Sequence, residues 1–460
     1  MTRASVAEVL AERAGALRSA DISPAVRGVC ENLLIDVAGL CVAARHSDYV
    51  SALQRSLDAG GPCTALGHAE SYSPEDAALL NGTAAHGEDF DDTFEGGPVH
   101  SGAVIVPAVL AACERFGCDG NAALLGIATG VEALCRLSLV APKLIHKAGF
   151  HPTAVLGAIA STLSVSKTLQ LNAEQTVNAL GIAGSMAGGI IEYLAEGAWT
   201  KRLHAGWAAH AGLHAARIAR EGFTGPRTVF EGAHGLFFAF SHGKDLDYEK
   251  LTRGFGTDWH LTGLTFKPYA TGTMNQPYID CALRLRDGSL RLGERGFRAE
   301  DVAEVLCETA EGYVHRLWEP LAAKQRPAND YAAKFSTPFN VAVAFVTGGA
   351  GFDAFSERTV RDERILTLAG KVRYRVDPEN PYPKRYTGHV KMTLKDGRVF
   401  EERQPHIRGG VHEPLSRAEI ERKFRGNAAY GGWPPVLADQ FLAFAKEAFN
   451  GSMDLTAFRR

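Results

Sequence analysis

Apolar residues recur every three or four positions through most of the first ~260 residues of the chain. This spacing lines one side of an α-helix with apolar side chains. The segments that show it most strongly are 26–42, 74–86, 104–116, 121–139, 152–169 and 204–220. Pro152 stands at the expected first residue of its helix, a position that proline favours. The pattern predicts an all-helical domain, in which abundant alanine and glycine let neighbouring helices approach closely.

Near residue 265 the pattern changes from helical spacing to alternation. Residues 302–309 and 370–376 alternate apolar and polar side chains, which is typical of half-buried strands. Residues 389–401 predict a β-hairpin, because Asp396-Gly397 suits its tight turn. Two helices are also predicted in this region, at 274–285 and 337–346.

The chain returns to helical spacing at Ser416. Ser416 and Glu419 form a capping box, the reciprocal pairing of side chains and backbone N–H groups that starts many helices. A terminal helix is predicted over 440–449, and this tail is expected to pack on the first domain. The predicted fold is mostly α, with a large all-helical domain built from both chain ends and a smaller α+β lid domain. We place the helical domain at 1–264 and 406–460, and the lid domain at 265–405.

The composition is that of an ordinary globular protein. The chain has 460 residues, of which 46% are apolar and 22% charged, and its formal net charge is −3. That length exceeds what a single hydrophobic core usually serves, which supports two domains. The near-neutral charge balance argues against nucleic acid or an anionic membrane as a partner.

Cysteine content and the N-terminal pattern indicate the compartment. The eight cysteines show neither Cys-x-x-Cys nor a zinc-binding spacing, so we expect buried, reduced thiols. No run of about 18 apolar residues is free of polar breaks, so no membrane-spanning helix is predicted. Residues 2–20 predict an amphipathic helix that carries Glu8 and Glu12, and acidic residues are not typical of a signal or transit peptide. We therefore expect a cytoplasmic protein.

Four short polar segments interrupt the apolar surroundings. They are residues 86–93 with 100–102, 149–153, 200–206 and 267–269. Each brings imidazole, carboxylate, ammonium or hydroxyl groups into a neighbourhood of residues that proteins tend to bury. We expect the four segments to line one catalytic pocket for a small anion.

The first segment combines an acid, a base and a hydroxyl group. On a continuous helix, His86, Asp89 and Thr93 share one face, and Asp91 and Asp92 lie off that face. Such a group can position a substrate hydroxyl and move a proton. The alternative is a solvated acidic helix end. A metal site is less favoured, because the ligands are crowded and no second cluster accompanies them.

The end of the first segment and the next two segments add histidines and a lysine. His100 lies in a turn before an apolar helix and is a candidate general acid, its alternative role being loop hydrogen bonding. His151 stands at the N-cap of its predicted helix, where unpaired N–H groups attract anions, its alternative role being plain capping. Lys201 and His204 precede the next predicted helix, where an ammonium group is a suitable carboxylate clamp.

Lys267 and Tyr269 fall at the predicted domain junction, where a ligand clamp is expected. Without the other segments, this lysine would be assigned to the surface. His210 and His214 resemble half of a zinc-binding helix but lack its glutamate, so we interpret them as packing or surface residues. The chain contains neither a phosphate-binding loop nor a Gly-x-Ser-x-Gly nucleophile elbow.

The order and content of these motifs resemble the MmgE/PrpD family, which includes 2-methylcitrate dehydratase, cis-aconitate decarboxylase and iminodisuccinate epimerase. The resemblance extends over essentially the whole chain. It rests on residues 81–93, 149–153, 200–206, 267–269 and 333–336. It implies a helical domain made of both chain ends, an α+β lid and a homodimer. It also implies metal-free, cofactor-free chemistry on polycarboxylates in the cleft.

The resemblance also assigns residues to the pocket. Those that match the decarboxylase branch of the family are Asp89, Thr93, His100, His151, Lys201 and Lys267. Two positions depart from that branch, because Gly272 stands in place of a histidine and Phe339 in place of a tyrosine. The chain thereby lacks a proton donor and a hydroxyl group, which argues against cis-aconitate decarboxylation.

The leading hypothesis is a cofactor-independent lyase, most simply a hydro-lyase that dehydrates a citrate-like hydroxy acid such as 2-methylcitrate. Asp89 or a nearby histidine removes the proton beside a carboxylate, His100 helps water leave, and positioned charges stabilise the enolate-like state. The predicted catalytic residues are Asp89, His100, His151 and Lys201. The predicted substrate-binding residues are Thr93, His204, Lys267 and Tyr269. Alternatives are an epimerase of an iminodisuccinate-like dicarboxylate, a cis-aconitate-type decarboxylase, and a polycarboxylate-binding protein without catalysis.

Overall fold

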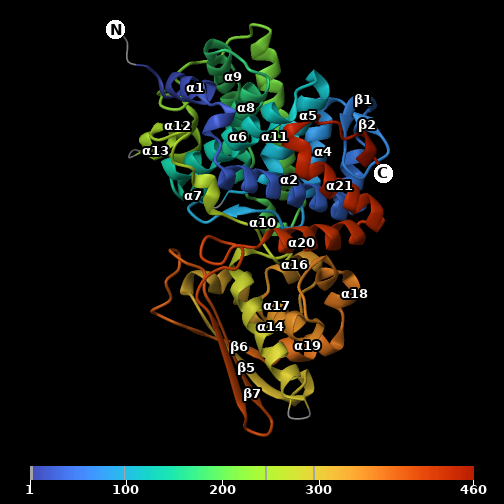
Figure 1. Cartoon of the computed structure of the whole chain (residues 1–460). Coiled ribbons are helices and arrows are strands. Elements are labelled where there is room, and N and C mark those ends of the chain that lie inside the picture. Colours follow the sequence, from blue (N-terminus) through green and yellow to red (C-terminus); the bar gives the residue numbers. More distant parts are fainter. Residues whose placement is uncertain (1–3, 98, 244–245, 294–295) are drawn as a thin grey trace. The chain divides into compact units, whose positions relative to one another are not determined.

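Figure 1 shows a computed structural model of the chain, which describes residues 4–97, 99–243, 246–293 and 296–460. The chain divides into two compact units. The helical unit comprises Met1–Gly87, Asp91–Leu264 and Ser416–Arg460, and the mixed unit comprises Glu88–Phe90 and Thr265–Leu415. Residues 406–415 and the short segment Glu88–Phe90 thus belong to the mixed unit, outside the predicted range of 265–405. Pro98, in the predicted turn before His100, and residues 2 and 3 of the predicted N-terminal helix lie outside the described residues.

Six long helices form the core of the helical unit. They are α2 (Pro24–Ala44), α4 (Pro74–His86), α5 (Gly102–Phe116), α6 (Gly120–Val140), α8 (Pro152–Thr168) and α11 (Thr200–Arg220). Helix α8 packs on both α6 and α11, and α11 packs on α4. The structure confirms the predicted helices, with one correction. Helix α11 begins at Thr200, whereas its predicted start is residue 204. The prediction starts too late because the first turn carries polar side chains, which do not show the apolar spacing.

Helix α6 has the length and composition of a membrane-spanning helix, with a mean hydropathy of 1.6 over its most apolar window. However, 89% of that window is buried inside the protein. Its polar residues Glu132 and Arg136 are buried together as an ion pair. These features are typical of a helix in a protein core.

Further helices complete the helical unit. They are α1 (Val6–Ala16), α3 (Asp48–Gln54), α7 (Leu144–Lys147), α9 (Ala173–Met186), α10 (Tyr193–Glu196), α12 (Leu236–Ser241), α13 (Glu249–Thr252), α20 (Arg417–Tyr430) and α21 (Pro435–Glu447). The predicted capping box of Ser416 and Glu419 is present. Helix α20 packs on α2, where Lys423 Nζ lies 2.7 Å from Oδ1 of Asp36. The C-terminal tail therefore packs on the helical unit, as predicted.

The helical unit is not wholly helical, which corrects the prediction. Strands β1 (Ala59–Thr64) and β2 (Ser71–Tyr72) form an antiparallel pair, and β3 (Thr93–Phe94) is a two-residue strand. The glycines and proline of β1 mask the alternation that normally reveals a strand. A Cβ atom at Gly61 would lie 2.0 Å from the carbonyl oxygen of Tyr72, so this pairing requires glycine.

The mixed unit is built around a four-stranded sheet with the order β6-β5-β7-β8. Its strands are β5 (Val302–Thr309), β6 (Val372–Val376), β7 (Gly388–Leu394) and β8 (Val399–Gln404). Strands β5 and β6 run parallel, whereas β7 is antiparallel to both β5 and β8. The structure thus confirms both predicted strands and the predicted hairpin.

Helices α14 (Gln276–Arg291) and α17 (Thr337–Thr347) pack on each other, and α14 also packs on β7 and β8. Helix α14 continues to Arg291, beyond its predicted end at 285. The prediction stops short because the last turns of the helix are polar and lack the apolar spacing. The other α-helices of this unit are α15 (Leu321–Gln325), α16 (Asp330–Lys334), α18 (Glu357–Val360) and α19 (Glu363–Ala369). The first residue of β4 (Leu264–Thr265) belongs to the helical unit and the second to the mixed unit. Across both units the eight cysteines are unpaired, and all but Cys118 are buried, as expected.

Candidate active site

Four buried histidine rings lie against one another in the helical unit, and we call them the histidine cluster: His86, His100, His151 and His204. The ring centroid of His86 lies 4.9 Å from that of His100 and 5.6 Å from that of His151. His151 is in turn 5.2 Å from His204. The four come from the end of α4, the loop before α5, the N-cap of α8 and the beginning of α11. Segments far apart in the sequence therefore converge, as predicted for these residues.

Helix packing explains how two of these segments meet. Gly82 of α4 and Gly206 of α11 face each other without side chains. A Cβ atom at Gly82 would lie 2.7 Å from the Cα atom of Gly206, so the two helices approach as closely as backbones allow. This approach places the C-terminal residue of α4, His86, in the same region as His204 of α11.

Asp91 contacts two members of the histidine cluster. Its Oδ2 atom lies 2.7 Å from Nδ1 of His86, and its Oδ1 atom lies 3.5 Å from Nδ1 of His100. The side chains of His86 and Asp91 are both fully buried. Because a carboxylate accepts hydrogen bonds, the His86 imidazole donates through Nδ1. This leaves Nε2 as the nitrogen that carries the lone pair.

Asp92 has a different role from its neighbour. Its carboxylate accepts hydrogen bonds from the backbone N–H groups of Ser101 and Gly102 at the start of α5, at 3.0 and 2.8 Å. Burial and the nearby charge of Asp91 raise the pKa of Asp92 to about 7. The backbone carbonyl of Asp92 accepts a hydrogen bond from Nδ1 of His100 at 2.7 Å. His100 therefore carries its proton on Nδ1, and Nε2 is the nitrogen available for chemistry.

His151 and His204 form a pair whose Nδ1 atoms are 3.1 Å apart. One of the two must donate and the other accept, so the rings adopt different tautomers. Burial, followed by the charges of nearby groups that include Lys201, lowers the pKa of His204 to about 4. Burial and the same kind of repulsion hold the pKa of His151 well below its ordinary value. Both imidazoles are thus neutral near pH 7 in the absence of an anion.

Lys201 is buried within the first turn of α11. The sequence places it before the helix, and the structure corrects this to the helix itself. Its charge acts on both His151 and His204. A cation and neutral imidazoles at two helix N-termini form an environment that favours a carboxylate guest.

The predicted common face of His86, Asp89 and Thr93 is wrong. Helix α4 ends at His86, and Asp89 has a left-handed backbone with φ 55°. The chain therefore leaves the helix, and Asp91, predicted to lie off the reactive face, becomes the partner of His86. Thr93 is buried in β3. The sequence pattern does not reveal the contact of Asp91 with His86, because the position of Asp91 depends on this turn.

The remaining predicted site residues belong to the mixed unit. Lys267 is almost fully buried and donates a hydrogen bond to the backbone carbonyl of Asp89 at 2.8 Å. The Tyr269 hydroxyl donates to Asp280 at 2.6 Å, and burial raises the pKa of that carboxyl group to about 6. Lys334, to which no role was assigned, lies 2.8 Å from the Glu88 carboxylate and donates to the Glu88 carbonyl. The predicted residues thus fall into two groups, one in each unit.

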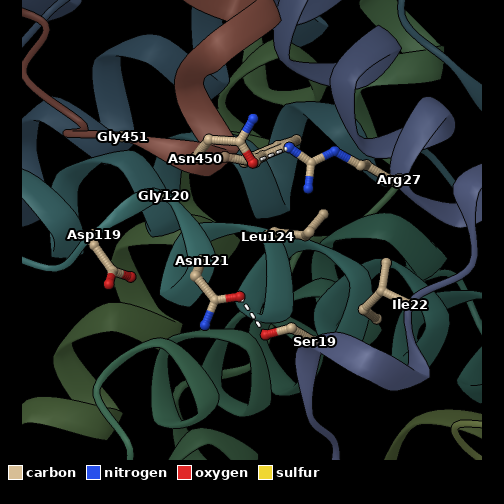
Figure 2. Close-up of a pocket in the computed structure, with 10 residues that line it drawn as sticks. Ser19, Ile22, Arg27, Asp119, Gly120, Asn121, Leu124, Asn450 and Gly451 are labelled. Carbon is tan, nitrogen blue, oxygen red and sulfur yellow. Dashed lines mark hydrogen bonds between the residues drawn. The ribbon is translucent and has the colours of Figure 1, made fainter.

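Two other observations bear on ligands. Among the described residues, His86, Asp91 and His100 offer metal-ligand atoms within 4.8 Å of one another. Their types suit a zinc-like ion, so the expected metal independence stays a prediction. A separate hollow of about 350 Å³ in the helical unit is lined by residues such as Arg27, which donates to Asn450 at 2.8 Å (Figure 2). It contains none of the predicted site residues.

Comparison with known proteins supports the family. The model of the MmgE/PrpD N-terminal domain matches residues 8–249, and that of the C-terminal domain matches residues 269–434. Human cis-aconitate decarboxylase is 30% identical over 368 residues, which cover 77% of this chain and 73% of that protein. The cis-aconitate decarboxylase-like protein oryM of Aspergillus oryzae is 25% identical over 429 residues, covering 89% and 87%.

A relative with another activity also aligns. The mitochondrial 2-methylcitrate dehydratase of Yarrowia lipolytica is 25% identical over 305 residues, which cover 62% of this chain and 56% of that protein. The two family models together cover most of the chain. The resemblance inferred from the sequence motifs is therefore confirmed, and the chain belongs to the MmgE/PrpD family.

Proposed function

We propose that the chain is a cofactor-independent lyase of a small polycarboxylate, most simply a hydro-lyase that dehydrates a citrate-like hydroxy acid such as 2-methylcitrate. The observation that carries the proposal is the buried histidine cluster beside Lys201, which joins proton-exchanging groups to a cation. Relatives named for cis-aconitate and 2-methylcitrate support this class of substrate.

In this mechanism, Lys201 and His151 bind substrate carboxylates at the beginnings of α11 and α8. The proton on a carbon beside a carboxylate is weakly acidic, so fixed positive charge is needed where the enolate-like charge develops. A bound carboxylate also raises the pKa of His151 and His204, since its negative charge favours the imidazolium form and offsets the burial and repulsion that lower the pKa. Substrate binding thereby brings protons into the site. His100 gives one of them to the departing hydroxyl group.

Four further residues keep their predicted roles in the proposal. Asp89 is a candidate catalytic residue, and Thr93, Lys267 and Tyr269 are candidate substrate-binding residues. Single substitutions followed by measurement of kcat and KM test each of them. We also propose a cytoplasmic homodimer, for which light scattering and cell fractionation are the tests.

A cis-aconitate-type decarboxylase is the second candidate. Relatives with that name align over more of the chain than the 2-methylcitrate dehydratase does. Two positions count against it. A Cβ atom at Gly272 would lie 3.1 Å from the Phe335 ring, and Phe339 is fully buried near Phe355. Neither position supplies the imidazole or hydroxyl group of the decarboxylase branch.

One experiment separates the candidates. Purified protein is incubated in deuterated buffer with 2-methylcitrate, citrate, cis-aconitate or iminodisuccinate and followed by NMR. The proposal expects an unsaturated acid to form from a citrate-like hydroxy acid. Loss of a carboxyl group identifies a decarboxylase, and deuterium exchange without elimination identifies an epimerase. If the folded protein turns over none of these acids, the proposed function is wrong.

A further inference from the structure

The His86 imidazole is held at one nitrogen and open at the other. Nδ1 donates to Oδ2 of Asp91 at 2.7 Å, and neither side chain is exposed. Nε2 is buried and has no hydrogen-bond partner among the residues that the structure describes. A buried polar atom without a partner costs free energy, and proteins seldom keep one without a use. We therefore expect that a bound molecule supplies the hydrogen atom that Nε2 of His86 accepts.

The two adjacent carboxyl groups have distinct surroundings, which identifies the one that acts on His86. Asp92 faces backbone N–H groups at the start of α5, and both of its carboxylate oxygens accept hydrogen bonds there, at 3.0 and 2.8 Å. Asp91 instead faces the imidazoles of His86 and His100. An ionised Asp91 fixes His86 as the tautomer with a proton on Nδ1, and it stabilises positive charge on either ring.

We propose that His86 is a catalytic residue whose Nε2 removes the proton from the carbon beside a substrate carboxylate, and that Asp91 is its positioning residue. This inference rests on the proposed lyase function and names the base for it. Asp89, the carboxylate favoured from the sequence, belongs to the mixed unit and adopts a left-handed backbone. The sequence pattern left open a nearby histidine as the base, and the geometry selects His86.

The step balances in atoms and electrons. The carbon–hydrogen bond breaks as its proton moves to Nε2 of His86. Its electron pair forms the carbon–carbon double bond, while the carbon–oxygen bond to the neighbouring carbon breaks. His100 enters this step as the imidazolium, with a proton on each nitrogen. The departing hydroxyl group takes the proton from Nε2 of His100 and leaves as water, and the proton on Nδ1 stays on the Asp92 carbonyl. His86 gains one proton and His100 loses one, and exchange with solvent restores both.

The test compares H86Q and D91N with a matched control, H210Q. His210 lies on α11, stacks on Trp207 and also has a buried nitrogen without a partner among the described residues, yet it is not in the histidine cluster. H86Q should lower kcat on the substrate found by the NMR panel by about 100-fold or more, with little change in KM. D91N should lower kcat in the same direction, D91E should restore part of it, and H210Q should match the wild type.

A second measurement does not depend on turnover. Nitrogen-15 NMR of labelled histidine in the full-length wild-type protein should show His86 protonated at Nδ1 and unprotonated at Nε2, and D91N should disturb this state. Turnover in H86Q within tenfold of wild type, or a His86 protonated at Nε2, would overturn the inference and leave the proposed function standing. Failure of the wild type on every acid of the panel would overturn the proposed function itself.

Discussion

The histidine cluster of the helical unit and the buried lysines of the mixed unit bury ionisable groups in opposite ways. In the mixed unit, Lys334 lies against the Glu88 carboxylate and Lys267 donates to the Asp89 carbonyl. In the helical unit, His151 and His204 face each other, and burial, together with nearby charges such as that of Lys201, lowers the pKa of both and keeps them neutral. The pair of Lys334 and Glu88 already balances its two charges within the protein, which indicates a structural role. The histidine cluster becomes more favourable when an anion arrives, which indicates a binding role.

Removing one partner of the buried pair should have the largest effect on stability. K334M leaves the Glu88 carboxylate without its ammonium partner, and breaking a buried pair in this way typically costs about 3–5 kcal/mol of unfolding free energy. Denaturant unfolding measures the loss. Removing both charges in E88Q/K334M should recover part of it. The exposed pair of Arg253 and Glu249 is the control, because R253A should change stability by less than about 1 kcal/mol.

The dependence of stability on pH should differ between the members of the histidine cluster and Asp92. The pKa of His204 is 6.5 in the unfolded chain and about 4 in the folded protein. Between these two pH values the unfolded chain binds a proton at His204 and the folded protein does not, so this residue makes stability rise with pH. Asp92 acts oppositely between about pH 4 and 7, because the folded protein keeps a proton that the unfolded chain releases.

These contributions are on the order of 3–5 kcal/mol, since one pKa unit corresponds to about 1.4 kcal/mol. Unfolding measured across this pH range should therefore show a smaller rise with pH in H204Q and a steeper rise in D92N than in the wild type. Parallel curves for all three proteins would contradict the assigned protonation states.

Substitutions in the cluster should affect catalysis more than folding. H151A and K201A should each lower kcat/KM by about 100-fold, because hydrogen bonds to charged groups are worth about 1.5–3 kcal/mol. Since His151 and Lys201 are proposed to bind substrate carboxylates, the loss should appear mainly as a higher KM. Steady-state kinetics measure this, and light scattering should show an unchanged oligomeric state. H214Q, at a half-exposed position on the same helix, should behave as the wild type. Wild-type kinetics in both cluster variants would show that the pocket is assigned wrongly.

The smallest effect should follow removal of metal ions. The predicted chemistry needs no metal, although His86, Asp91 and His100 have suitable ligand types. Elemental analysis should find less than one metal ion per chain, and a chelator should leave kcat unchanged. A stoichiometric metal whose removal abolishes turnover would assign these three residues to a metal centre.

The sequence predicted regular elements better than the turns between them. Apolar spacing locates α4 and α8, and alternation with Asp-Gly locates the β7–β8 hairpin, because these signals are local. Strand β1 was missed because glycine and proline mask its pattern.

The spacing of apolar residues also does not predict contacts between residues that are distant in the sequence. Lys334 was missed although its motif was noticed, because its partner Glu88 lies 246 residues away. The residue types of the site were therefore predictable, whereas the pairing of His86 with Asp91 required the turn after α4.

Calorimetric titration of the wild-type protein with 2-methylcitrate, citrate and cis-aconitate, in buffers of different ionisation enthalpy at about pH 6, tests the central claim most directly. The account predicts that one of these acids binds with uptake of protons by the histidine cluster, and that H204Q reduces this uptake. Binding without proton uptake, or an uptake unchanged in H204Q, would contradict it.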